Sequence, residues 1–279
     1  MSVSRIVLPI FMAASLAACG TYVPELQEFP GGPADGQLLV QDIVQSVHCE
    51  VANAVNEVIE ADKLLAKEKN HGFRSIAWLD SWGVQLTLTL TVVEKSTLSP
   101  NGVYMPVSPV TSVFTLAGGA TGSAEATRTD TLNYFYSVAN LKRAAPCGFK
   151  PAGPPNSLLV QSDLKLREWL FSQLMSFGTG AVDFPTNPNG LFKQNVLSHE
   201  VKFVVSTSGT LNPAWTLVRG TINQSGSLLA ANRDRTHDLL ITFGPIDKDA
   251  TKGLVSAAAE NHFARLVGLA VANNVRPIP

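Results

Sequence analysis

The sequence has few cysteines, few charges and no long apolar run beyond its N-terminal segment. Its 279 residues include 3 cysteines, and 15% of them are charged, with a formal net charge of -1. No later run reaches the roughly 18 apolar residues that a membrane helix needs. The near-neutral balance provides no basic stripe of the kind that binds nucleic acid. A hydrophobic content of 45% is typical of a folded globular protein and not of a disordered chain.

The motifs of common enzyme families are also missing. The chain has no Gly-x-Ser-x-Gly elbow, no His-Glu-x-x-His, no Cys-x-x-Cys and no phosphate-binding loop with its lysine. His199-Glu200 lacks the second histidine of a zinc motif. The glycine-rich run 118–122 precedes a strand-like segment, whereas a phosphate cradle needs a helix N-terminus, and so it predicts a hairpin turn. We therefore expect no cofactor, no metal site and no enzymatic activity.

The N-terminus has the pattern of an export signal. Arg5 is its only charge, residues 6–18 are mostly apolar, and Leu16-Ala17-Ala18-Cys19-Gly20 follows. These residues resemble the lipobox of bacterial lipoprotein signal peptides. The resemblance implies that residues 1–18 are removed and that Cys19 carries the acyl chains, including palmitate. Because Gly20 and not aspartate follows the cysteine, it also implies the periplasmic face of the outer membrane. The alternative is an ordinary secretory signal with a chance cysteine.

Two further cysteines remain in the exported chain, Cys49 and Cys147. An even number of cysteines in an exported protein indicates a disulfide. It would close a loop of about 100 residues, worth about 4–5 kcal/mol in the chain-entropy model. The alternative is a pair of buried free thiols.

Periodicity predicts a helix followed by strands. Residues 19–37 are rich in proline and glycine and read as a flexible tether. Apolar residues then recur at three- and four-residue steps over 38–69, as in an amphipathic helix. From Val84 to Val93 the apolar residues alternate with threonines, which predicts a half-buried antiparallel strand with a solvent-facing threonine side. Further strands are expected at 110–117 and 132–138, which gives a first unit over 38–145.

The pattern then restarts after a proline-rich linker, 146–157. Leu38-Leu39-Val40-Gln41 returns as Leu158-Leu159-Val160-Gln161, and the turn 97–100 returns at 210–213. The inward positions of the first strand align with apolar residues of the second copy. We therefore predict an α+β fold, in which a helix plus a three-stranded antiparallel meander is duplicated. The second unit covers 158–247, and an extra C-terminal helix with a tail covers 248–279.

Charged residues mark the start of the third strand in both copies. The first copy has Arg128 and Asp130, and the second has Arg235, His237 and Asp238. The repeated arginine–aspartate pattern suggests a paired polar surface site. The simpler alternative is a charge pair at a strand edge that prevents sheet aggregation and contributes under about 1 kcal/mol.

The same segments resemble the bacterial trypsin-co-occurring domain. That family combines a helix and strands with a Gly-Ser run and an Arg-Thr pair before an alternating strand. The matching stretches here are Gly122-Ser123 to Leu132 and Gly226-Ser227 to Leu239. The resemblance implies an accessory role, and no catalytic residue carries over.

These features favour a lipid-anchored, non-enzymatic protein of the bacterial envelope that binds a protein partner or supports assembly. Its expected partners are the membrane, through the N-terminal lipid, and an envelope protein. Two alternatives stay open. One is an envelope hydrolase acting on cell wall or peptide, with candidates His199, His237, Asp130 and Asp238. The other is a small-ligand binder between the units, walled by Trp78, Trp82 and Trp215.

Overall fold

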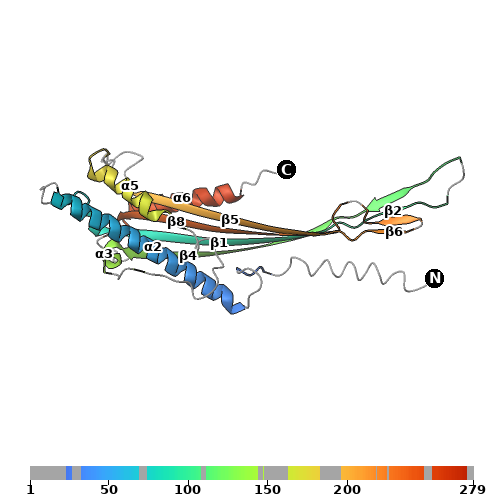
Figure 1. The fold of residues 1–279 in the computed structure, drawn as a ribbon, viewed down its shortest axis with the longest axis horizontal. Coiled ribbons are helices and arrows are strands. Elements are labelled where there is room, and N and C mark those ends of the chain that lie inside the picture. Colours follow the sequence, from blue (N-terminus) through green and yellow to red (C-terminus); the bar gives the residue numbers. More distant parts are fainter. Residues whose placement is uncertain are drawn as a thin grey trace. The chain divides into compact units, whose positions relative to one another are not determined.

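The fold combines helices with antiparallel sheets, as an α+β protein does (Figure 1). The computed structural model describes residues 23–26, 33–68, 74–107, 111–143, 147, 163–182, 196–217, 219–224, 226–247 and 253–274. The predicted signal peptide, Cys19 and most of the predicted linker lie outside these residues. The elements are α2 (Pro33–Glu68), η1 (Ala77–Ser81), β1 (Trp82–Leu98), β2 (Asn101–Tyr104), β3 (Leu116–Gly119), β4 (Gly122–Ser137), α3 (Val138–Leu141), α5 (Leu166–Gly178), β5 (Leu197–Leu211), β6 (Trp215–Leu217), β7 (Gly220–Ile222), β8 (Leu229–Pro245) and α6 (Ser256–Asn274).

The strands form two sheets. The long sheet has the order β4-β1-β8-β5, and the short sheet has the order β3-β2-β7-β6. In the short sheet, β2 pairs antiparallel with both β3 and β7, and β6 pairs antiparallel with β7. Each sheet therefore contains strands from the first and from the second half of the chain. The two halves are joined by β1 against β8 in one sheet and by β2 against β7 in the other.

The chain divides into two compact units, and neither is a continuous stretch of sequence. Unit 1 comprises residues 1–26, 90–130 and 204–236, and it contains the short sheet. Unit 2 comprises residues 27–89, 131–203 and 237–279, and it contains the helices. These boundaries differ from the expected sequential units 38–145 and 158–247, because strands of both halves contribute to each compact unit.

In unit 2, helices cover both faces of the sheet. Consecutive strand residues point to opposite faces, and so neighbouring contacts identify which helix covers which face. On one face, the His48 ring of α2 lies 4.7 Å from Tyr136, and the Trp169 ring of α5 lies 6.1 Å from Phe243. On the other face, His262 of α6 bonds to Thr87 and Thr242. The sheet is therefore the middle layer, with α2 and α5 on one side and α6 on the other.

This layering corrects the prediction for the first strand. The threonine side of the strand was expected to face solvent. Thr87 is instead 1% exposed, because α6 packs over that face and His262 satisfies its hydroxyl group. The apolar side of the strand is buried, as its alternation predicts; Val84, Leu86, Leu88 and Leu90 are fully covered.

The three-stranded meander also differs from what the structure contains. The strand expected over 110–117 is β3, which begins at Leu116 and ends at Gly119, and residues 112–115 are in no helix or strand. A further short strand, β2, precedes it. Each half of the chain contributes two long and two short strands. The first helix begins at Pro33, within the stretch predicted as tether, and α5 begins at Leu166, later than the predicted Leu158.

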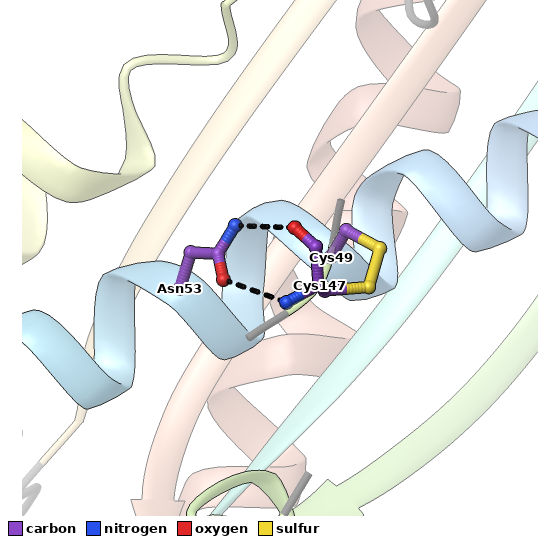
Figure 2. Close-up of a disulfide and its surroundings, with 3 residues drawn as sticks. All are labelled: Cys49, Asn53 and Cys147. Atoms are coloured by element: carbon purple, nitrogen blue, oxygen red, sulfur yellow. Dashed lines mark hydrogen bonds between the residues drawn. A yellow bond between two sulfur atoms is a disulfide. The ribbon is translucent and has the colours of Figure 1, made fainter. Parts of the chain in front are cut away.

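A disulfide ties the first helix to a distant segment. Cys49 of α2 is bonded to Cys147, which is 98 residues away in sequence. Figure 2 shows Asn53, one helical turn on, holding the same segment by two hydrogen bonds. Its Nδ2 donates to the Cys147 carbonyl at 3.2 Å, and the Cys147 amide donates to its Oδ1 at 3.4 Å. The two contacts fix Cys147 against α2, so that a long loop is closed on a buried helix face.

Replacing both cysteines, Cys49→Ala with Cys147→Ala, should lower the free energy of unfolding by about 2–5 kcal/mol, since the unfolded chain loses the constraint on a long loop. Urea unfolding monitored by circular dichroism measures the change. A thiol reductant should destabilise the wild-type protein and leave the double variant unaffected. Equal stability of wild type and variant would show that the bond contributes nothing.

Candidate functional site

The polar groups predicted as a paired surface site do not come together. Arg128 and Asp130 of β4 form a local pair, with Arg128 Nη2 at 2.8 Å from Asp130 Oδ2, and both are about one-third exposed. Arg235, His237 and Asp238 of β8 are buried, with exposed fractions of 4%, 5% and 6%. The strand β8 is central in the long sheet, and β1 separates it from β4. The prediction of one surface site is therefore wrong.

Asp238 is the most strained of these groups electrostatically. Its pKa is raised to about 6, chiefly by burial and also by the nearby carboxylate of Glu200, while Lys202 acts in the opposite direction. Its Oδ2 atom is buried and makes no hydrogen bond. A buried carboxylate without full hydrogen bonding opposes ionisation. The group therefore destabilises the fold above its pKa, and its burial leaves it unexposed to a substrate.

His199 serves to hold the start of α5. Its Nε2 donates to the Leu164 carbonyl at 3.2 Å, and its ring stacks on Trp169 at 4.8 Å. The Leu164 amide in turn donates to Glu50 of α2 at 3.1 Å. The pKa of Glu50 is raised to about 7, chiefly by burial. The Leu164 hydrogen bond acts to lower this pKa, and the charge of Asp163 acts to raise it. Both side chains bind the backbone of Leu164, which indicates a structural role at the junction of α2, β5 and α5.

The inner face of α6 carries a buried histidine that the sequence patterns did not single out. His262 is 1% exposed. Its Nδ1 lies 2.7 Å from Thr242 Oγ1 and its Nε2 lies 2.8 Å from Thr87 Oγ1. Thr87 donates its hydroxyl proton to Asn133 at 2.5 Å. Thr87 therefore accepts from Nε2–H. Because burial lowers the pKa of His262 to about 4, the ring is neutral at pH 7, and Thr242 then donates to Nδ1.

This network has the geometry of packing and not of catalysis. A nucleophilic triad needs an accessible hydroxyl, a histidine and an orienting carboxylate. Here the hydroxyl groups are covered, and the chain of bonds ends in the amide of Asn133. The i, i+4 spacing of Ala258 and His262, both buried, is the signal that would have placed this histidine on the inner face of the C-terminal helix.

The described residues contain neither a metal-binding cluster nor a membrane-spanning helix. Among the described residues, no cluster of three or more histidine, cysteine, aspartate or glutamate side chains could hold a metal ion. In that same part of the chain, no helix combines the length and the apolar character needed to cross a bilayer.

In unit 1, the N-terminal segment is held by two arginines. Arg233 donates to the Glu25 carbonyl and, at 2.7 Å, to the Glu94 carboxylate. Arg128 Nη1 lies 3.7 Å from the Glu25 carboxylate. Leu26 is buried beside them. Residues 23–26 are thus packed on unit 1, unlike the flexible tether expected over 19–37. We call this set of contacts the Glu25 clamp.

The short sheet of unit 1 exposes large apolar side chains. Trp215 is 50% exposed, Phe114 58% and Leu217 60%. Asn223, which is fully buried, fixes the base of this sheet. It donates to Asn212 Oδ1 and to the Pro213 carbonyl, and it accepts from Asn101. We call the exposed set the apolar end; its members are Tyr104, Met105, Phe114, Leu116, Trp215 and Leu217.

The tryptophans proposed as walls of a ligand groove lie in different units. Trp78 and Trp82 belong to unit 2, where their rings are 4.5 Å apart. Trp215 belongs to β6 of unit 1. The Trp78 ring also lies 6.4 Å from the ring of Phe177 on α5.

Comparisons with known proteins return little. No protein-family model matches the sequence, and no curated protein matches it. Among solved structures, the InvG secretin domain from the Salmonella SPI-1 injectisome NC-base is 9% identical. That alignment covers 67% of this chain and 69% of the other, with a TM-score of 0.13. A likeness at this level carries no argument about fold or function.

Replacing Asp238 by asparagine should stabilise the protein at neutral pH. The folded-state pKa of about 6 lies above the ordinary aspartate value of 3.8, and so folding is increasingly opposed as pH rises between the two values. The Asp238→Asn variant should be more stable by about 2–3 kcal/mol at pH 7 and equally stable below pH 4. Unfolding curves over this range provide the measurement, with Glu260→Gln as the exposed-carboxylate control. Parallel curves for Asp238→Asn and wild type would contradict the assignment.

Proposed function

We propose that this chain is a lipid-anchored protein of the bacterial cell envelope that acts by binding a protein partner and not by catalysis. The lipobox-like sequence around Cys19 supports the anchor, its acyl chains and an outer-membrane location. The observation that carries the binding role is an apolar stripe on α6. Phe263, Val267 and Val271 are 66%, 46% and 56% exposed.

The geometry of α6 makes this stripe a docking surface. The three residues recur every four positions and therefore share one face of the helix. Ala258 and His262, which are buried, mark a different face that packs on the sheet. Glu260, three residues before Phe263, lies on the same side of the helix as the stripe. An apolar centre with a charged rim is the usual composition of a protein interface, and an amphipathic helix fits an apolar groove.

We also propose that the chain arose by internal duplication. The element order in support is a helix, a long strand, two short strands and a long strand, found as α2-β1-β2-β3-β4 and again as α5-β5-β6-β7-β8. The similar turns at 97–100 and 210–213 follow equivalent positions, since β1 ends at Leu98 and β5 at Leu211. The repeated unit then has four strands in place of the three expected.

No observation favours the hydrolase alternative. His237 and Asp238 are buried in β8. His199 is bonded to a backbone carbonyl and stacked on Trp169. Asp130 is paired with Arg128. The non-enzymatic role is therefore the simpler proposal.

A photoreactive amino acid at Val267 tests the binding role in living cells. It should yield one discrete protein adduct, because the stripe is the contact surface. Phe263→Asp, one turn away, should remove most of the adduct, since a carboxylate at the centre of the interface is desolvated without a partner. The matched control is Phe171→Asp on α5, another exposed aromatic residue (40%) of unit 2.

The adduct should persist in the Phe171→Asp variant. Thermal unfolding of both variants establishes that α6 remains folded. No adduct at Val267, or equal loss in the two aspartate variants, would overturn the proposed docking surface.

A further inference from the structure

We propose that the apolar end of unit 1 inserts into the lipid surface that also holds the acyl chains of Cys19. The second half of this statement rests on the proposed lipid anchor, whereas the insertion itself rests on the short sheet. The surface offered to lipid consists of aromatic and aliphatic side chains from both halves of the chain. Tyr104 and Phe114 come from the first half of the chain, and Trp215 and Leu217 come from the second half.

The absence of charge distinguishes this end of the molecule. No charged residue occurs between Ser96 and Ala124, which includes β2 and β3. From Phe203 to Asn232, which includes β6 and β7, Arg219 is the only charged residue. Charged groups are costly to move into hydrocarbon. The two segments that the structure brings into one sheet thus contain a single charged residue, Arg219.

The short sheet also satisfies much of its own backbone. Its strands pair through three antiparallel ladders, β2–β3, β2–β7 and β6–β7. Buried Asn223 bonds the turns at its base. The outer edges of β3 and β6 have no neighbouring strand within this sheet, and unpaired backbone groups are not tolerated in the hydrocarbon core. These features fit shallow insertion at the level of the headgroups, where tyrosine and tryptophan are enriched.

The Glu25 clamp places the proposed lipid within reach of the same surface. Glu25 follows Cys19 by six residues, which span at most about 20 Å when extended. On β1, Glu94 is bonded by the same Arg233. From Glu94 to Tyr104, the first member of the apolar end, there are ten residues, about 33 Å at the rise of a strand. The stretch from Glu25 to Cys19 is shorter than this path, and so acyl chains on Cys19 and the apolar end can enter one leaflet together when the strands of unit 1 are inclined to the membrane.

The composition favours lipid over a protein partner. A protein interface normally has a polar rim, and on α6 the carboxylate of Glu260 lies on the same side of the helix as the stripe. Neither segment of the short sheet contains a carboxylate. Arg219, which precedes β7 and is exposed, is a cation suited to bind a lipid phosphate. The apolar end and the α6 stripe are therefore two surfaces of different chemistry.

Tryptophan quenching tests the insertion. The acylated full-length mature chain is reconstituted into vesicles of phosphatidylcholine and phosphatidylglycerol whose acyl chains carry bromine. Bromine near the headgroup end should quench wild-type fluorescence. Trp215→Phe should lose this quenching, whereas Trp169→Phe, a half-buried tryptophan of α5 stacked on His199, should retain it.

A second pair of variants separates insertion from the presence of a particular tryptophan. Phe114→Asp with Leu116→Asp adds charge to the apolar end and should reduce quenching of Trp215. Phe263→Asp with Val267→Asp adds the same charge to α6 and should leave quenching unchanged. Circular dichroism confirms that each variant is folded.

Quenching that persists in Trp215→Phe, or that is absent from the wild type, would overturn the inference. If Trp215 is unquenched and crosslinks instead to another protein or to a second copy of the chain, the apolar end is a protein interface and the inference is also overturned. The mass of the N-terminal peptide reports acylation of Cys19 independently. A missing acyl group would contradict the proposed anchor, and quenching with added vesicles would still decide whether the apolar end inserts.

Discussion

The pairing of β1 with β8 at the centre of the long sheet is the constraint on which the rest of the structure depends. These strands come from different halves of the chain, and each has a partner from its own half on the other side, β4 or β5. Because the centre of the sheet is shared, neither half can form its core alone. In unit 2 the shared centre leaves two faces to cover, and α2 with α5 covers one while α6 covers the other. Buried apolar residues of α2, β1 and β8 then contribute to the driving force for folding.

The central position of β8 also explains its polar residues. This strand has a neighbour on both sides, and its residues Arg235, His237 and Asp238 are buried. Burial opposes the ionisation of Asp238 and therefore raises its pKa. His262 shows the favourable counterpart, since both of its ring nitrogens find threonine hydroxyl groups on adjacent strands of the sheet. Polar burial here organises the contact between sheet and helix.

Local patterns predicted the parts of the fold that depend on local periodicity. The alternation from Val84 predicted β1, and the three- and four-residue spacing predicted α2. The short strands were not predictable in this way, because three or four residues of β2, β6 and β7 contain too little periodicity. The shared sheet could not be predicted either, since pairing between distant strands leaves no mark on the sequence near them. The sequence near Thr87 likewise does not show that α6 covers it, and so Thr87 was expected to be exposed. The contacts of Glu25 with Arg128 and Arg233 also join residues that are far apart in sequence.

The chain has two proposed binding surfaces, an apolar end for lipid and an α6 stripe for a protein. Photolabelling by a phospholipid with a diazirine in its acyl chain tests this assignment most directly. The acylated chain in vesicles is irradiated, digested and mapped by mass spectrometry. We expect labelled peptides within 101–119 and 212–224, and no label on peptides from α6. Labels on α6, or labels confined to the N-terminal peptide, would contradict it.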